Sequence, residues 1–213
     1  MPKSVDLRRT PQQGRGKESR SRILDGAKKI LSQGGIEKFN MRRISAASSV
    51  GLSTIYDYFP SKTSVLQVLL EERLKLQLAI FDHTIANIPA EAKLPEFIDT
   101  YLQNMRSEGM WSAYDSGLNA AARQDDSLQD LFDWHEEETI DRYVRAFRLA
   151  GSNWADADLR TAASYLISIS AQFEPGAVPS TDKDERKLML ELVHQTFAMV
   201  LKKLLDGGTK PNG

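Results

Sequence analysis

Hydrophobic residues recur three or four positions apart along most of the chain, the spacing that places side chains on one face of an α-helix. The first such stretch predicts a helix that begins near residues 17–21 and ends at Gly34-Gly35, since glycine favours a helix terminus. The apolar face of this helix consists of Ile23, Leu24, Ala27, Ile30 and Leu31.

Two short helices are predicted to follow, joined by a tight turn. Asn40 is placed to cap the first, because its side chain can accept a backbone N–H that the helix leaves unpaired, and this helix runs to about Ser48. The second covers about residues 52–59, and Pro60 ends it. The residues expected to pack the two helices across the turn are Ile44, Ala47, Val50 and Ile55.

A long helix, capped by Ser61, is predicted to reach about Asn87, before Pro89. Glycines and prolines separate further helices predicted over residues 94–107, 110–123, 126–150, 155–174 and 183–206. No convincing strand alternation interrupts this pattern. The sequence therefore predicts an all-α protein of about nine helices, with a three-helix head and a larger helical body.

The turn between the two short helices is the most informative part of the chain. Gly51 and Ser53 open the second helix, and Tyr56, Tyr58 and Lys62 crowd one end of it with donors suited to phosphate. This is the layout of a helix-turn-helix, whose second helix can enter a major groove. The side chains expected to face outward from that helix are Leu52, Ser53, Thr54, Asp57 and Tyr58.

The charge distribution agrees with this interpretation. The chain has 41% hydrophobic and 27% charged residues and a net charge of only −1, which is ordinary for a globular protein. Residues 1–65 carry 13 Lys/Arg and 5 Asp/Glu, a balance of +8, whereas the remainder carries 15 and 24, a balance of −9. A basic end on an acidic body is typical of polyanion binding, although a solvated basic tail would give the same numbers.

The same segment resembles the DNA-binding motif of the TetR (tetracycline-repressor) family of transcriptional regulators. The resemblance is close in Ser53-Thr54-Ile55-Tyr56, Tyr58-Phe59 and Pro60-Ser61-Lys62, and it covers roughly residues 20–70, about a quarter of the chain. The upstream residues that share it are Ile23-Leu24-Asp25, Ala27, Gly34-Gly35, Met41-Arg42 and Ile44.

The resemblance implies a repressor that acts as a homodimer on a palindromic double-stranded DNA operator and is released by a small-molecule effector. The phosphate contacts it implies come from Asn40, Ser53, Tyr56, Tyr58 and Lys62. The base contacts it implies come from Arg43, Leu52, Thr54 and Asp57, with Arg42 beside them.

Two positions depart from the usual pattern of the family. Ser49 stands in the turn, where the family usually has glycine, so it would adopt a backbone conformation that glycine adopts more readily. Gly51 stands where serine often caps the second short helix, which removes one side-chain donor to phosphate.

Several of these residues have a plainer interpretation. Asp57 could read the N4 amine of a cytosine, or it could be a surface charge that faces water. Tyr56 and Tyr58 could be packing residues with wet hydroxyls. Lys62 could be a solvated lysine, although the helix dipole disfavours a cation at a helix start unless a phosphate faces it.

The implied domains are a flexible basic arm at residues 1–16, the helix-turn-helix DNA-binding domain at 17–63, an effector-binding and dimerisation domain at 64–207 and a disordered tail at 208–213. Basic arms can lie in the minor groove, or they can simply solubilise a tail. The basic residues counted with the arm are Arg8, Arg9, Arg15, Lys17, Arg20 and Arg22.

The body is rich in aromatic residues, which taken singly favour core packing and as a set favour an apolar effector pocket. The candidate pocket residues are Phe81, Trp111, Tyr114, Phe132, Trp134, His135, Tyr143, Phe147, Tyr165 and Phe173. The last two helices have apolar stripes wider than one core-facing side needs, which predicts a dimer interface unless they form an intramolecular core. The candidate interface residues are Ala163, Ile167, Leu188, Leu192, Val193, Phe197, Val200 and Leu201.

The sequence offers little support for an enzyme. His135, Glu138 and Asp141 have helical spacing and could bind a metal, but a solvated helix face explains the neighbouring acidic run better. No cofactor, metal or membrane partner is expected. The absence of cysteine and of an apolar leader suits the cytoplasm. A helical enzyme or metal-binding protein and a helical adaptor for acidic protein remain the alternative functions.

Overall fold

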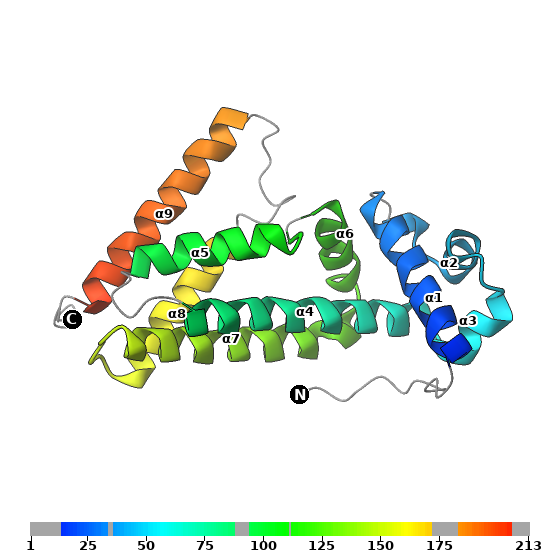
Figure 1. Cartoon of the computed structure of the whole chain (residues 1–213), viewed down its shortest axis with the longest axis horizontal. Coiled ribbons are helices and arrows are strands. Elements are labelled where there is room, and N and C mark those ends of the chain that lie inside the picture. The colour runs from blue at the N-terminus through cyan, green and yellow to red at the C-terminus, as the bar shows by residue number, and fades with distance from the viewer. Residues whose placement is uncertain (1–13, 34–35, 88–93, 111, 172–182, 206–213) are drawn as a thin grey trace. The chain divides into compact units, whose positions relative to one another are not determined.

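The computed structural model describes residues 14–33, 36–87, 94–110, 112–171 and 183–205 of the chain. Within these ranges the regular structure is helical and contains no strand, as the sequence predicts (Figure 1). The α-helices are α1 (Gly14–Ser32), α2 (Met41–Ser48), α3 (Leu52–Tyr58), α4 (Lys62–Asn87), α5 (Leu94–Ser107), α6 (Ala113–Ala122), α7 (Gln129–Leu149), α8 (Asp156–Ala171) and α9 (Lys183–Leu205).

Three helix starts differ from the prediction by three residues. α7 begins at Gln129 rather than near residue 126, because Asp126–Leu128 form a 3₁₀ helix. α1 begins at Gly14, three residues before the earliest predicted start, in a segment assigned to the flexible arm. α6 begins at Ala113 rather than near residue 110, because a reciprocal capping box sets its start. In this box the Ser112 hydroxyl accepts from the Asp115 backbone N–H, and the Asp115 carboxylate accepts from the Ser112 N–H at 2.8 Å.

The chain divides into two compact units, each with its own apolar core. The first unit comprises residues 1–76 and 110–134, and the second comprises residues 77–109 and 135–213. α4 and α7 contribute residues to both units. The sequence places the end of the DNA-binding domain at residue 63. The division into compact units does not test this functional boundary, which stays a prediction.

The core of the first unit joins α1, α2, α3 and the first half of α4. Ile23, Ile44, Ile55 and Phe59 are completely buried in it. Because helices of eight and seven residues are marginal in isolation, burial against α1 and α4 is what stabilises α2 and α3.

One predicted core position is wrong. Ile44, Val50 and Ile55 are buried across the turn as predicted, but Ala47 is exposed and Ser48 is buried in its place. The buried stripe of α2 contains Met41, Ile44 and Ser48, at i, i+3 and i+7. α1 approaches Ser48 closely at Gly26. A Cβ atom added to Gly26 would lie 2.9 Å from the Ser48 backbone nitrogen.

α6 packs on α1 in the same unit through a second glycine (Figure 1). A Cβ atom added to Gly117 would overlap the Leu31 carbonyl oxygen. The ion pair of Arg73 with the buried carboxylate of Asp115 holds the start of α6 to α4, with 2.8 Å between Arg73 Nη2 and Asp115 Oδ2. α6 is therefore fixed to the helices that carry α2 and α3.

The second unit has an aromatic core. The Phe81 ring makes edge contacts with Phe97, Tyr101 and Tyr143 at centroid separations of 5.3, 5.2 and 4.9 Å. The Ser152 hydroxyl donates to the Leu204 carbonyl at 2.9 Å and ties the end of α9 to the segment before α8.

Replacing Gly117 with alanine is predicted to lower the free energy of unfolding by about 1–3 kcal/mol, because a methyl group at this helix crossing meets backbone that cannot move away cheaply. Chemical denaturation measures the change. The control is Ala120→Ser on the exposed side of α6, which should shift stability by no more than about 0.5 kcal/mol. Equal stability of Gly117→Ala and the wild type would contradict the close α1–α6 packing.

Candidate nucleic-acid interface

The start of α2 is fixed by its cap. Asn40 has an extended backbone, with φ −150° and ψ 162°, and its Oδ1 accepts from the Arg43 backbone N–H at 3.0 Å. The predicted N-cap is thereby confirmed. Arg42 and Arg43 are exposed in the first turn of α2, and no ion pair engages either side chain in the part of the chain described here.

The turn after α2 has the strained backbone that the sequence predicts. Ser49 lies in the left-handed region, with φ 55° and ψ 33°, and is the one non-glycine residue with positive φ in the described ranges. This conformation costs an L-residue about 1–2 kcal/mol. Two serines of α2 help to hold it: the Ser45 hydroxyl donates to the Val50 carbonyl at 2.7 Å, and the Ser48 hydroxyl accepts from the Val50 N–H at 3.3 Å.

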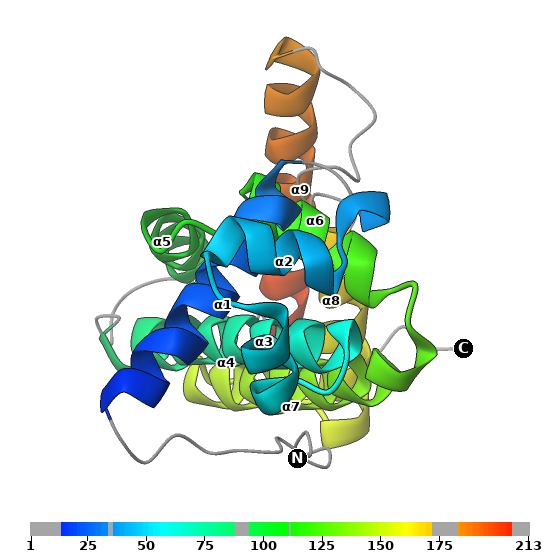
Figure 2. The ribbon, with the colours of Figure 1, turned by 90° about the vertical axis from the view of Figure 1, so that its right-hand side faces the viewer.

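α3 presents a polar face beside this turn, and Figure 2 views the unit from the side on which α2 and α3 lie. Ser53 and Asp57 are exposed, Thr54 is half-buried and Tyr56 is 42% exposed. Gly51 caps α3 without a side-chain hydrogen bond, as expected.

Two residues expected to face outward from α3 do not do so fully. Tyr58 is only 8% exposed, and Leu52 is half-buried against the core. In a helix of two turns, Ile55, Tyr58 and Phe59 lie at i, i+3 and i+4 and together form the core-facing side. The Tyr58 ring therefore packs in the core, which agrees with the alternative that Tyr58 is a packing residue.

The start of α4 completes this surface. The Ser64 N–H donates to the Ser61 hydroxyl and the Ser61 N–H donates to the Ser64 hydroxyl, both at 3.1 Å. Ser61 therefore caps α4, as predicted. Lys62 is exposed next to it. Hydrogen bonds from Ser127 and Thr63 lower the pKa of the Asp125 carboxyl, and the Thr63 hydroxyl lies 2.6 Å from Asp125 Oδ2. The positive charge of Lys62 makes a smaller contribution in the same direction.

The candidate pocket residues are divided between the two cores. Tyr114, Phe132 and Trp134 pack against the core of the first unit. The three members that belong to the second core are Phe81, Tyr143 and Phe147, and burial raises the pKa of the Tyr143 hydroxyl. Tyr165 is 52% exposed, and Trp111 and Phe173 lie outside the described residues.

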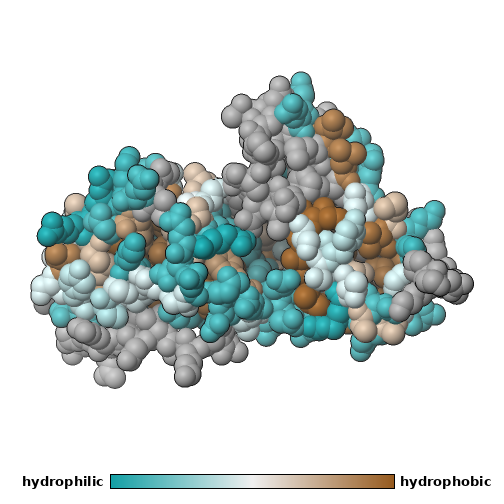
Figure 3. Space-filling view, turned by 180° about the vertical axis from the view of Figure 1, so that it is seen from behind, coloured by the Kyte–Doolittle hydropathy of each residue, from teal (hydrophilic) through white to brown (hydrophobic). Residues whose placement is uncertain are grey.

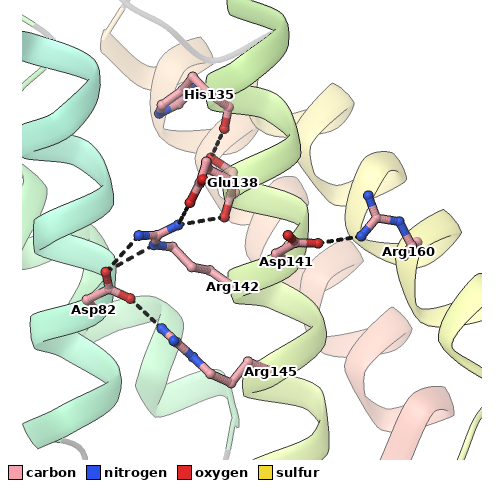
Figure 4. A network of polar contacts seen from close by, with 8 residues as sticks. Asp82, His135, Glu138, Asp141, Arg142, Arg145 and Arg160 are labelled. Atoms are coloured by element: carbon pink, nitrogen blue, oxygen red, sulfur yellow. Dashed lines mark hydrogen bonds and ion pairs between the residues drawn. The ribbon is translucent and has the colours of Figure 1, made fainter. Parts of the chain in front are cut away.

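The acidic residues near His135 are bound by arginines (Figure 4). Arg142 donates to Asp82 Oδ2 from Nε at 3.1 Å and from Nη2 at 2.9 Å, and its Nη1 lies 2.7 Å from the Glu138 carboxylate. Arg160 pairs with Asp141. These ion pairs hold Glu138 and Asp141, and the described ranges contain no group of three ligands placed to bind a metal. The geometry gives no support to the metal-binding alternative.

His135 itself is an unusual group in this network. Its Nε2 is buried and has no hydrogen-bond partner among the described residues. Burial, together with the smaller effect of the positive charge of Arg142, lowers the pKa of His135 to about 4. The imidazole is therefore neutral at pH 7.

The candidate interface helices expose an apolar face in the second unit. Leu188, Leu192 and Met199, all on α9, are 57%, 52% and 66% exposed. Figure 3 shows hydrophobic residues in brown on the part of the surface that α9 forms. Ala163 and Phe197 lie instead in the core of the unit, where they cannot line a surface. The remaining candidates are the half-buried Ile167 and Val200, and Val193 and Leu201, whose side chains the structure does not describe.

The fold and the α2–α3 geometry define a helical protein that carries a helix-turn-helix. Residues 23–69, which contain α2 and α3, match the family described as "Bacterial regulatory proteins, tetR family". None of the helices in the described ranges is long and apolar enough to cross a membrane.

The curated relatives match only part of the chain. The HTH-type transcriptional repressor KstR of Rhodococcus jostii is 44% identical over 50 residues, 24% of each chain. KstR of Mycobacterium tuberculosis is 29% identical over 123 residues, 55% of this chain and 56% of its own. The chain thus spans about a quarter to a half of the length of the curated relatives it matches.

Solved structures share the fold over most of the chain. Salmonella enterica GusR has a TM-score of 0.65 at 20% identity and covers 88% of this chain and 95% of its own. RolR in complex with resorcinol has a TM-score of 0.55 at 13% identity and covers 93% and 97%.

The buried His135 predicts a pH dependence of stability. The folded-state pKa of about 4 lies below the unfolded value near 6.5, so the unfolded chain binds a proton that the folded chain does not. Stability should therefore fall as pH falls from about 6.5, by up to about 2 kcal/mol at pH 5. His135→Leu should remove most of this loss in denaturation at pH 7.5 and pH 5. His83→Gln, at an exposed position, should keep the wild-type profile. A wild-type loss retained in His135→Leu would refute the assignment.

Proposed function

We propose that this chain is a transcriptional repressor that binds a double-stranded DNA operator through α2, α3 and the start of α4. The observation that carries the proposal is the two-sided character of α3. Ile55, Tyr58 and Phe59 fix the helix to the core, while Ser53, Tyr56 and Asp57 remain exposed beside it. A helix held in this way can enter a major groove without losing its packing.

The residues around α3 sort into those that set register and those that read bases. Ser53 and Tyr56 on α3 and Lys62 at the start of α4 are exposed donors, which suits contacts to phosphate. Asn40 Oδ1 accepts the cap hydrogen bond and its Nδ2 lies 3.5 Å from the Lys38 carbonyl, so a phosphate contact would use the second hydrogen of Nδ2.

Base contacts would come from Thr54, Asp57 and Arg43, which lie on the outer sides of α2 and α3. Arg43 suits a guanine and Asp57 a cytosine amine. Leu52 would add an apolar edge, since it is only half-buried. Arg42 and the buried Tyr58 would lie beside these contacts.

We further propose that the operator is palindromic and that the protein binds it as a homodimer through the exposed face of α8 and α9. A two-fold dimer places two recognition helices in successive major grooves, roughly 34–36 Å apart in the simplest geometry. Leu188, Leu192 and Met199 offer the apolar surface that such a contact would cover.

A small-molecule effector would act through the body. RolR, which shares the fold, is described in complex with resorcinol. An effector releases DNA only if it binds one arrangement of the dimer more tightly than the other. α4 supplies residues to both compact units, which makes it the element through which we propose that effector binding alters the spacing of the heads.

Operator binding is tested first by selection of double-stranded DNA from a random library with the purified chain. On the enriched site, Lys62→Ala should lower the slope of log affinity against log salt by about one, because one fewer counterion is released. Thr54→Ala should relax sequence preference and leave nonspecific affinity nearly unchanged. Lys75→Ala is the control, since this exposed lysine pairs with Glu71 on α4. No enrichment, or an equal slope for Lys62→Ala and the wild type, would count against this reading surface.

Dimerisation is tested by Leu192→Glu. A carboxylate placed at a buried apolar contact has no partner, so the variant should sediment as a monomer or become insoluble. The matched control is Leu149→Glu, which makes the same substitution at an exposed leucine of α7, outside the proposed interface, and should leave the dimer intact. A folded Leu192→Glu dimer would place the interface elsewhere.

A further inference from the structure

Arg22 is an arginine of α1 that the sequence groups with the basic arm, where it would contact the DNA backbone. In the structure its guanidinium is directed to the end of α2 instead. Arg22 Nη2 donates to the Ser48 carbonyl at 3.0 Å and to the Ser49 carbonyl at 2.9 Å. These are the two carbonyls at the point where the chain leaves α2 and enters the turn.

Both carbonyls need a partner that the helix cannot supply. The last carbonyls of a helix have no intrahelical N–H to accept from, and they form the negative end of its dipole. An arginine there supplies both the missing donors and a compensating charge. The left-handed conformation of Ser49, which disfavours an L-residue, makes the turn dependent on such a contact.

The close approach of α1 to α2 makes this contact possible. Gly26, one helical turn after Arg22, is the residue whose missing side chain lets α1 approach the Ser48 backbone. Arg22 and Gly26 stand at i and i+4 and therefore share one face of α1. On this face of α1, Gly26 leaves room for the end of α2 and Arg22 binds its carbonyls.

With Arg22 included, four successive carbonyls of the turn have partners. Arg22 binds those of Ser48 and Ser49, the Ser45 hydroxyl binds that of Val50, and the Ile55 N–H binds that of Gly51 at 3.0 Å. The last of these bonds begins α3. The direction in which α3 leaves the turn is therefore fixed from α1.

We propose that Arg22 is a positioning residue for operator recognition, which orients α3 by clamping the Ser48–Ser49 carbonyls, and not a phosphate contact. The proposal rests on the proposed DNA-binding function. Arg22 compensates in this chain for the serine in the turn, because it stabilises from outside a conformation that glycine would adopt unaided.

The test is a double-mutant cycle of Arg22→Ala, Ser49→Gly and the double variant on the enriched operator. Arg22→Ala should weaken specific binding by roughly tenfold, a difference of about 1.4 kcal/mol. Its salt slope and its affinity for random duplex should stay close to the wild type, because no phosphate contact is lost. Ser49→Gly should restore most of the lost affinity in the double variant, since the two changes act on the same turn.

Two further variants sharpen the cycle. Arg22→Lys should recover part of the affinity, since an ammonium can still donate to these carbonyls but without a planar fork. Lys29→Ala removes the same charge from an exposed position of α1 and should behave as the wild type. A salt slope lowered by about one in Arg22→Ala, or no rescue by Ser49→Gly, would overturn the proposal.

A measurement without DNA separates this inference from the proposed function. Amide exchange by NMR should show faster exchange at Val50 and Ile55 in Arg22→Ala and recovery in the double variant. Unchanged exchange at these amides would overturn the clamp even if the chain binds DNA. A wild-type chain that enriches no DNA sequence would refute the proposed function and, with it, the operator-recognition role of Arg22, whereas the exchange result would still decide whether the clamp exists.

Discussion

The proposed DNA-reading end of this protein depends on burial of a few side chains in one small core. α2 and α3 have eight and seven residues, too few to remain helical alone in water. Ile44, Ile55 and Phe59 stabilise them by packing on α1 and α4. That burial also decides which side of α3 faces outward, because a helix of two turns has one core face and one free face.

A short helix packed on a core is still free to rotate or tilt unless its entry is fixed. In this chain the entry is fixed by polar contacts around a left-handed serine, and α1 contributes to them through Arg22. α6 is fixed to α1 and α4 in the same unit, through Gly117 and the Arg73–Asp115 ion pair. α6, which lies well beyond the helix-turn-helix in sequence, therefore packs in the same unit as α2 and α3 and supports the helices that hold them.

Periodicity and capping residues predicted much of this from the sequence. The Asn40 and Ser61 caps, the turn at Ser49 and the limits of most helices follow local rules, and the structure agrees with them. The errors arise where a tertiary contact decides. Ser48 is buried rather than Ala47 because Gly26 approaches it, and Arg22 leaves the predicted arm because its partners lie 26 and 27 residues away. The candidate pocket shows the same limit, since aromatic composition does not say which of two cores each ring joins.

The most direct test of the account is hydrogen–deuterium exchange of the full chain with and without its enriched duplex. The account predicts protection confined to peptides that cover α2, α3 and the start of α4, about residues 40–62, in each protomer. A duplex that lacks the enriched sequence should protect these peptides weakly under the same salt conditions. Protection centred on α8 and α9, or spread evenly over the basic residues of the chain, would contradict the claim that α3 is held outward to read DNA.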